Sequence, residues 1–422
     1  MSTPAHAVTP VACTEGALRA AIANSNLVVG GDTLSLIPYC LYTLTDAGGG
    51  ALPQLSQPLV ILGNNATIKR DTSSSDFRIF DVGTGASLTA DTLTIMNGHA
   101  DATGGGGVLV NSGAGPLTAT NVNFQGNASD QDGGGVRVAA GALGTSTISG
   151  GVVSDNRATL DGGGIDAEGA VNIAGTTVSR NRATRFGGGI NNDVGAGMLN
   201  VSDAVVRNNS GVTGGMDLDA NAFITRTTMT DNTSRGGTGG GAIYSGGFLV
   251  IQNSVISGNT NTASTASQAG GIEADGTSVV ITSTRITNNR AIGANASGAG
   301  IYLNSGSLTL DGVTLTGNLA SGQYAVGGGI YAGGAGMTIQ NNTLVDNNKV
   351  TGTGSYAAGI YNTGTSVSLT GSHVDNNTAP PAPAPGGIWT DIQFTSVTGS
   401  TITGNTPTNC LLSPVIPTGC IG

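Results

Sequence analysis

The sequence predicts an all-β solenoid, a parallel β-helix of about 12 to 14 coils, and three observations lead to this fold class. First, a unit in which an apolar residue stands three positions before an asparagine recurs eleven times at spacings of 24 to 30 residues. Second, most units open with a glycine pair and an apolar residue, as in Gly240-Gly241-Ala242. Third, the unit is too short for two helices and is rich in Gly, Val, Ile and Thr, which favours short strands and turns.

The recurring asparagines and their apolar partners fix the register of the repeat. The asparagines are Asn127, Asn156, Asn181, Asn208, Asn232, Asn259, Asn289, Asn318, Asn347, Asn377 and Asn405. The apolar partners are Phe124, Val153, Val178, Val205, Met229, Ile256, Ile286, Leu315, Leu344, Val374 and Ile402. We expect about three strands per coil, such as 242–244, 248–251 and 255–257, with coils stacked at about 4.8 Å.

Asparagine and glycine are expected to form the corners between strands. Asn tolerates the left-handed backbone of a tight turn, and stacked Asn side chains can hydrogen-bond from coil to coil as a ladder. Glycine pairs such as Gly163-Gly164 and Gly328-Gly329 suit corners with positive φ or close packing. Both patterns indicate structural devices rather than catalysis.

The chain is expected to contain a cap at 1–58, the β-helix at 59–406 and a second cap at 407–422. Residues 14–26 form the one clear helix candidate, with Thr14 as N-cap and with Leu18, Ala21, Ile22 and Ser25 on one face. The first strands are expected at 32–36, 59–68, 79–82 and 87–96.

Four cysteines lie only near the two ends of the sequence. We expect the local disulfides Cys13–Cys40 and Cys410–Cys420, which would staple the caps and indicate an oxidising, extracellular location. Metal binding by these cysteines is the alternative, but no nearby histidine completes a tetrahedral set. We expect no metal and no cofactor.

Composition excludes several classes of partner. The net charge is −10, and lysine occurs only at Lys69 and Lys349, so a phosphate-binding basic patch and hence a nucleic acid partner are not expected. The sequence contains no run of 18 apolar residues, the length that a membrane-spanning helix needs.

The N-terminal segment has a specific resemblance. Cys13, then Leu18-Arg19-Ala20-Ala21-Ile22, then Gly31-Asp32-Thr33-Leu34 resembles the start of exported bacterial β-helix proteins of the CSLREAI type. Here residues separate Cys from Leu, and Ala20 stands where that family has Glu. Gly240-Gly241-Ala242-Ile243 and Phe124-Gln125-Gly126-Asn127 resemble the GGAI and FxxN motifs of polymorphic outer-membrane protein repeats. The resemblance covers nearly the whole chain and implies right-handed coiling, export and a surface or adhesive role.

A row of aromatic residues is the first candidate site. The segments between Asn and the next glycine pair lengthen along the chain, from 158–161 to 260–269, 291–299, 348–358 and 378–385. Beside them, one position of the repeat is aromatic in five coils, and Glu273 interrupts the row. Since the adjacent isoleucines point inward, the aromatics should point outward, either as a stacked row that stabilises the sheet or as a binding platform. The row consists of Tyr244, Tyr302, Tyr331, Tyr361 and Trp389.

Earlier coils carry polar residues at the same position. They are Arg137, Asp166, Asn191 and Asp217, with Glu168 and Asp219 two residues further on. Carboxylates on adjacent coils could lie about 5–10 Å apart, as in glycosidases, or could hold Ca²⁺, although such residues more often form a solvated face. If the chain is an enzyme, Asp166, Asp217 and Asp219 are the catalytic candidates; otherwise we expect no catalytic residues.

The remaining signals are weaker. His6, His99 and His373 are scattered, with His99 near Asp101 as a weak acid–base pair. Threonine pairs such as Thr228/Thr230, Thr314/Thr316 and Thr401/Thr403 could suggest ice binding, but Arg285, His373 and Asp375 interrupt the row.

These observations favour an extracellular or cell-surface, adhesin-like protein that binds a glycan or a cell-surface protein through the aromatic face. The first alternative is a polysaccharide lyase or glycoside hydrolase. The second is a structural rod or filament subunit that self-associates end to end or laterally.

Overall fold

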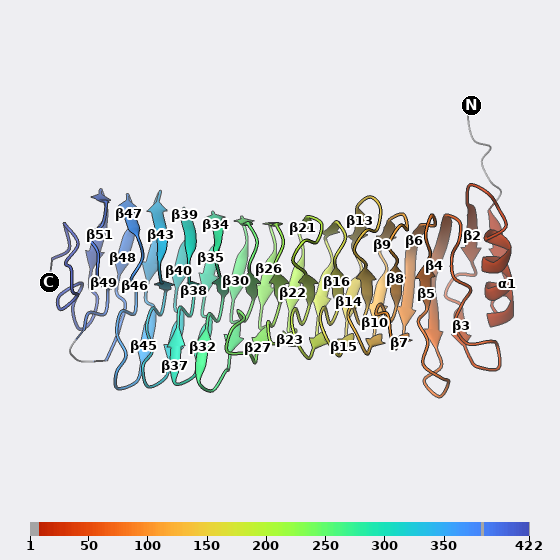
Figure 1. The fold of residues 1–422 in the computed structure, drawn as a ribbon, viewed down its shortest axis with the longest axis horizontal. Coiled ribbons are helices and arrows are strands. Elements are labelled where there is room, and N and C mark those ends of the chain that lie inside the picture. The colour runs from red at the N-terminus through yellow and green to blue at the C-terminus, as the bar shows by residue number, and fades with distance from the viewer. Residues whose placement is uncertain (1–7, 381–383, 422) are drawn as a thin grey trace, which may run out of the picture. The chain divides into compact units, whose positions relative to one another are not determined.

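The computed structural model describes residues 8–380 and 384–421, and the chain divides into two compact units, Met1–Val205 and Val206–Gly422. We call them unit 1 and unit 2. Within each unit, successive coils add parallel strands to three faces, A, B and C (Figure 1). The predicted fold class, a right-handed parallel β-helix, is confirmed, with about 14 turns in the chain.

In unit 1, face A has two strand positions per coil after the first coils. Its strands are β1 (Thr9–Val11), β2 (Asp32–Leu36), β3 (Leu41–Leu44), β4 (Leu59–Arg70), β6 (Leu88–Met96), β9 (Leu117–Thr120), β10 (Asn123–Gln125), β13 (Ser146–Ser149), β14 (Val152–Ser154), β17 (Val171–Ala174), β18 (Thr177–Ser179) and β21 (Leu199–Ser202). Face B contains β5 (Phe80–Val82), β8 (Val108–Val110), β12 (Val136–Val138), β16 (Ile165–Ala167) and β20 (Ile190–Asn192). Face C contains β7 (His99–Ala100), β11 (Ala128–Ser129), β15 (Arg157–Ala158) and β19 (Arg182–Ala183).

Unit 2 repeats this plan. Face A contains β25 (Ala222–Thr225), β26 (Thr228–Thr230), β29 (Leu249–Gln252), β30 (Val255–Ser257), β34 (Thr277–Thr282), β35 (Arg285–Thr287), β39 (Gly306–Asp311), β40 (Thr314–Thr316), β43 (Ala335–Gln340), β44 (Leu344–Asp346), β47 (Ser366–Thr370), β48 (His373–Asp375), β50 (Ser396–Thr398) and β51 (Thr401–Thr403), while β22 (Val205–Arg207) falls at the unit boundary in the sequence. Face B contains β24 (Met216–Leu218), β28 (Ile243–Ser245), β33 (Ile272–Ala274), β38 (Ile301–Leu303), β42 (Ile330–Ala332), β46 (Ile360–Asn362) and β49 (Ile388–Thr390). Face C contains β23 (Ser210–Gly211), β27 (Thr233–Ser234), β31 (Thr260–Asn261), β36 (Arg290–Ile292), β41 (Leu319–Ser321) and β45 (Lys349–Thr351).

The core of each unit consists of apolar rows in strict register. On face B of unit 2, Ile243 pairs with Ile272, Ile272 with Ile301 and Ile301 with Ile330. All are buried. Because side chains alternate along a strand, an inward isoleucine places the next residue on the outer side of the coil. This alternation positions the candidate site described below.

An asparagine ladder joins the coils within each unit, as predicted. The Asn259 Nδ2 donates to Asn289 Oδ1 at 3.0 Å and to the Met229 carbonyl at 3.0 Å, and the Asn259 backbone N–H also donates to Asn289 Oδ1. The buried amide is therefore satisfied by its neighbours. The ladder residues are Asn127, Asn156 and Asn181 in unit 1, and Asn209, Asn232, Asn259, Asn289, Asn318, Asn348, Asn377 and Asn405 in unit 2.

Two predicted ladder positions were wrong by one residue. Asn209 and Asn348, rather than Asn208 and Asn347, carry the ladder. The inward partners shift equally, so Val206 and Val345 are fully buried in place of Val205 and Leu344.

The assignment of the left-handed turn to the ladder asparagines was also wrong. The residue before each ladder asparagine has the positive φ, as at Asp155 (59°), Asn208 (56°) and Asn347 (52°). In Asn-Asn pairs the first residue therefore makes the turn and the second makes the ladder.

The glycine pairs serve close packing. A Cβ on Gly164 would lie 2.6 Å from the carbonyl oxygen of Gly189 on the next coil. The positive φ of this corner belongs to the preceding residue, Gly162 (61°).

Helix α1 (Glu15–Ser25) confirms the predicted N-terminal helix. The Thr14 side chain accepts a hydrogen bond from the Ala17 N–H, and Leu18, Ile22 and Ser25 are buried. The two short strands β1 and β3 beside it were not predicted. This helix is too short to cross a bilayer, and the described ranges contain no other helix that could do so.

Both predicted disulfides are present. Cys13 is joined to Cys40, and Cys410 to Cys420. Each closes a short segment near one end of the sequence.

The long segments of unit 2 are folded rather than open loops. They contain β32 (Ala266–Gln268) and β37 (Asn295–Ser297), which pair with each other in parallel. Small side chains beneath these and the neighbouring segments form a separate core cluster of Ala291, Ala296, Ala299, Ala320, Ala325, Val350, Ala358 and Ala379. In the segment 378–385, positions 381–383 lie outside the described residues.

Candidate functional site

The middle residue of each face-B strand forms a row on the outer side of the coils. In unit 2 this row runs in register through Asp217, Tyr244, Glu273, Tyr302, Tyr331, Tyr361 and Trp389. We call it the outer row of unit 2. The predicted aromatic positions are thus brought together, with Glu273 between Tyr244 and Tyr302.

Four aromatic rings of the outer row form a continuous stack. The ring centroids are 4.6 Å apart for Tyr302 and Tyr331, 5.0 Å for Tyr331 and Tyr361, and 4.7 Å for Tyr361 and Trp389, with interplanar angles of 12° or less. The spacing follows from the separation of neighbouring strands. Since the ring faces contact one another, the ring edges and the phenol hydroxyls are the parts available to a ligand.

A segment preceding the face-B strand packs against this stack. Tyr356 contacts Tyr361 edge to face at 5.7 Å and Trp389 at 5.7 Å. Gln268 of β32 donates from Nε2 to the Tyr302 hydroxyl at 2.9 Å. Burial raises the pKa of Tyr302 and Tyr361, so their hydroxyls stay protonated. Tyr356 and Gln268 were missed from the sequence because they come from segments of variable length.

Two buried carboxyl groups flank Tyr244 in register. Glu273 is 3% exposed and its Oε2 accepts a hydrogen bond of 2.7 Å from the Gly239 N–H. Burial, together with the charges of Asp217 and Asp275, raises the pKa of Glu273 to about 8. Asp217 is 3% exposed and accepts a hydrogen bond of 2.5 Å from the Thr213 hydroxyl. The expectation of a solvated face was therefore wrong for Asp217, because the segment containing Thr213 covers it.

The surroundings of Tyr244 are strongly acidic. Burial raises its pKa to about 12, and the nearby carboxylates of Asp219, Asp217, Asp275 and Glu273 act in the same direction. Asp219 is half-buried.

In unit 1 the outer row is ionic. Arg137 lies 3.3 Å from Asp166 and 3.5 Å from Asp132, and it also pairs with Glu168. Asp166 is fully buried and accepts a hydrogen bond of 2.9 Å from Asn191. Burial raises the pKa of Asp166 well above its usual range. The Arg137 guanidinium thus occupies the position among these carboxylates at which a metal cation would bind. The expectation that Asp166 lies on a solvated face was wrong, because Asp166 is buried.

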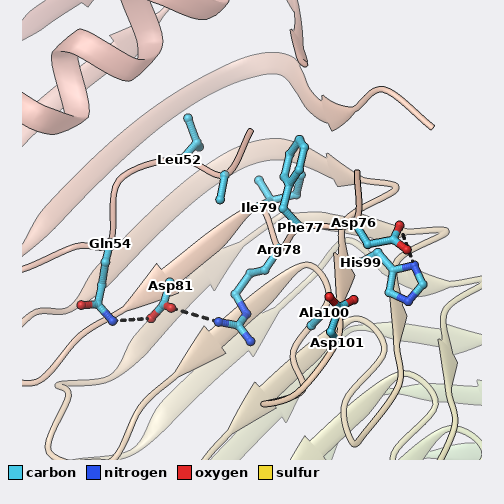
Figure 2. Close-up of a pocket in the computed structure, with 11 residues that line it drawn as sticks. Leu52, Gln54, Asp76, Phe77, Arg78, Ile79, Asp81, His99, Ala100 and Asp101 are labelled. Carbon is cyan, nitrogen blue, oxygen red and sulfur yellow. Dashed lines mark hydrogen bonds and ion pairs between the residues drawn. The ribbon is translucent and has the colours of Figure 1, made fainter. Parts of the chain in front are cut away.

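A separate pocket of about 210 Å³ lies in unit 1 and is lined by residues that include Gln54, Asp76, Arg78, Asp81 and His99 (Figure 2). Gln54 and Arg78 both bind Asp81, at 3.0 and 2.9 Å. His99 Nδ1 is 3.0 Å from Asp76 Oδ1, and its Nε2 is 3.2 Å from Asp130 Oδ1. The direct partners of His99 are therefore Asp76 and Asp130 rather than the predicted Asp101, which lies close by in the same pocket.

The remaining histidines and the threonine pairs singled out in the sequence do not belong to these groups. His373 Nδ1 is 2.7 Å from the Thr401 hydroxyl on face A of unit 2, and His6 lies outside the described residues. The threonine pairs occupy outward positions of β26, β40 and β51, and ice binding stays a prediction.

Comparison with known proteins bears on the fold. Residues 209–344 match the family model described as right handed beta helix region. No curated protein matches the chain. No solved structure matches it either. Together with the coil geometry described above, this match supports the right-handed parallel β-helix as the fold of the chain.

Proposed function

We propose that this chain is an exported surface protein, adhesin-like in role, that binds a neutral glycan along the outer row of unit 2. The observation that carries the proposal is the stack of four aromatic rings, in which Tyr302 is buried while Tyr331, Tyr361 and Trp389 are half-buried and keep part of their surface exposed. Aromatic groups exposed in a contiguous line commonly mark binding surfaces.

The chemistry of the row favours a neutral ligand. Tyrosine hydroxyls can donate to and accept from sugar hydroxyls, while the edges of the rings supply apolar contact. The row contains acidic residues and no lysine or arginine, so an acidic polysaccharide would meet like charge without a compensating cation.

Removing hydroxyl groups without removing rings tests the proposal. The variant Tyr331→Phe/Tyr361→Phe keeps the stack but loses two hydrogen-bonding groups. We expect its affinity for a retained neutral polysaccharide to fall about tenfold or more. Tyr39→Phe is the matched control, because Tyr39 is 79% exposed and lies in unit 1. Retention is measured by affinity electrophoresis on glucan, mannan and xylan, with polygalacturonate as the acidic member of the panel.

Several outcomes would contradict the proposal. Equal retention of the double variant and the parent would exclude the outer row, and retention on polygalacturonate alone would exclude a neutral ligand. Binding of a surface protein but no glycan would favour the protein partner instead. No binding at all would favour a structural or self-associating role.

Export is proposed on the basis of the disulfides. Cys13–Cys40 and Cys410–Cys420 account for all four cysteines, and stable disulfides are typical of extracellular proteins. Thiol labelling of protein taken directly from its native compartment tests this point, and reactive thiols there would contradict an oxidising location.

Glycoside hydrolysis is a second candidate because of Glu273. A carboxyl group with a pKa of about 8 is protonated at neutral pH and could act as a general acid. Asp217 lies two coils away in register, about 9–10 Å along the sheet, close to the separation used by inverting glycosidases. Release of reducing ends that is abolished by Glu273→Gln would establish this activity, and the absence of any product would exclude it.

A further inference from the structure

Three side chains with metal-binding atoms come together at the edge of the unit 1 pocket. Asp76 lies in the segment before β5, while His99 begins β7 and Asp101 directly follows β7. One donor atom from each of them lies within 4.8 Å of the other two. The sequence did not predict this group, because Asp76 is 23 residues before His99 and is brought beside it by a complete coil.

Asp130 holds the His99 ring in an orientation suited to a metal ligand. β11 pairs with β7 in register, and Asp130 directly follows β11. The Asp130 Oδ1 lies 3.2 Å from His99 Nε2. When Nε2–H donates to this carboxylate, Nδ1 presents its lone pair toward Asp76. A histidine fixed through its second nitrogen by a carboxylate is the usual arrangement in protein metal sites.

The remaining geometry allows the three donors to converge. Ligands at about 2.0–2.1 Å in tetrahedral coordination lie about 3.3 Å apart. Asp76 and Asp101 are exposed, so their side chains can close this distance by rotation. Asp101 makes no hydrogen bond or ion pair within residues 8–380 and 384–421. The adjoining pocket of about 210 Å³ leaves room for a water molecule or a ligand atom at a fourth position.

The positive charge of Arg70, beside Asp76, lowers the affinity of these three residues for a metal cation. Arg70 Nη1 is 3.1 Å from Asp76 Oδ1. Its guanidinium is also anchored by the carbonyl oxygens of Asn97, Ser74 and Ser75. The Asp76 carboxylate would therefore bridge Arg70 and the ion, which weakens its contribution as a ligand.

We propose that Asp76, His99 and Asp101 form a site for one divalent transition-metal ion of the Zn²⁺ type, with an open coordination position facing the pocket. An imidazole with two carboxylates suits a transition metal, whereas Ca²⁺ and Mg²⁺ prefer oxygen ligands alone. The site lies in unit 1 and does not depend on the glycan-binding proposal for unit 2.

Titration calorimetry of the tag-free full chain with Zn²⁺ tests the site. We expect one equivalent to bind, with no competition from millimolar Mg²⁺ or Ca²⁺. His99→Ala should abolish this binding, and Asp101→Asn should weaken it at least tenfold. The Asp101→Asn variant removes an exposed carboxylate that has no protein partner among the described residues, so we expect its circular dichroism spectrum to match that of the parent. His373→Ala is the control for loss of a histidine outside the site, because its side chain contacts the Thr401 hydroxyl, and it should bind Zn²⁺ like the parent.

A spectroscopic measurement tests the role of Asp130 as a positioning residue. In protein loaded with Co²⁺, Asp130→Asn should alter the visible absorption spectrum and weaken binding by about 10-fold while His99 still coordinates. An unchanged spectrum and affinity would exclude that role. The site itself would be overturned if Zn²⁺ did not bind stoichiometrically, or if it bound equally well to His99→Ala.

Discussion

The outer rows of the two units occupy the same position of the repeat but are stabilised differently. In unit 1 the row is ionic, with Arg137 among the carboxylates of Asp132, Asp166 and Glu168. In unit 2 the row becomes a stack of aromatic rings from Tyr302 to Trp389. Both rows are largely covered, although their side chains point away from the coil interior. An outward position in this fold is therefore not the same as a solvated one.

The difference lies in how each unit compensates for that burial. A buried carboxylate that has no charge partner tends to become protonated, as the raised pKa of Glu273 shows. Stacked rings need no such partner, and each additional coil with an aromatic residue extends the contact. The ionic row should therefore be sensitive to loss of one residue, and the aromatic row more tolerant.

The largest effect is expected from Arg137→Ala in unit 1. This change leaves the clustered carboxyl groups of Asp132, Asp166 and Glu168 without their shared cation and should destabilise the unit by about 3–5 kcal/mol. Urea unfolding followed by circular dichroism measures the loss. Arg180→Ala is the control, because the Arg180–Asp155 pair is about half exposed on both sides and should contribute less than about 1 kcal/mol. Equal effects of the two changes would refute the ionic interpretation of the row.

The asparagine ladder should be equally important in both units. Asn156→Ala in unit 1 and Asn289→Ala in unit 2 each leave a neighbouring backbone N–H and side-chain amide without their acceptor. Each substitution should cost about 3 kcal/mol, measured by urea unfolding. Fluorescence of Trp389, the only tryptophan, follows unit 2 alone, while circular dichroism follows the whole chain. A large difference between the two sites would show that the units differ in more than their outer rows.

The stability of unit 2 should fall as the pH rises from about 5 to 8. The pKa of Glu273 is raised from 4.5 to about 8 in the folded unit, so in this range the folded state holds a proton that the unfolded chain has released. The loss should be about 3 kcal/mol across the range. Glu273→Gln should remove it, as measured by urea unfolding with Trp389 fluorescence at each pH. Asp231→Asn, which changes an exposed carboxylate that does not contribute to the raised pKa of Glu273, should keep the parent pH profile, and a flat parent profile would contradict the prediction.

The smallest effect is expected within the aromatic stack. Tyr331→Leu removes two ring contacts but preserves apolar volume, and should cost about 1–2 kcal/mol. Thermal unfolding monitored by Trp389 fluorescence measures this change. If the loss matched that of Arg137→Ala, the aromatic row would be no more tolerant than the ionic one.

The fold was predictable because its determinants are local and repeated. Alternating apolar residues, glycine corners and the Asn register recur through eleven successive units, and the cysteines lie near each end. The errors at Asn208 and Asn347 arose where two asparagines are adjacent. There the spacing alone does not distinguish the residue with positive φ from the residue in the ladder.

The candidate sites were only partly predictable. Face-B register brought Tyr302, Tyr331, Tyr361 and Trp389 together as expected, since it follows from the repeat. The burial of Glu273 and the contacts of Tyr356 depend on how inserted segments fold over the face, which spacing does not encode. The partners of His99 were missed for a related reason, because Asp76 and Asp130 belong to neighbouring coils.

The asparagine ladder of unit 2 also has a direction. Each side-chain amide donates to the asparagine of the coil that follows it and to a carbonyl oxygen of the coil before it, and the series of asparagines passes from Asn405 to Asn409. The Asn409 amide then donates to the carbonyl oxygen of Ile421 instead of to another asparagine. The ladder of side-chain amides therefore ends at a contact with the segment that contains Ile421. A further coil could extend the ladder beyond Asn409 only after displacing that segment, as is expected where a segment covers an open sheet edge.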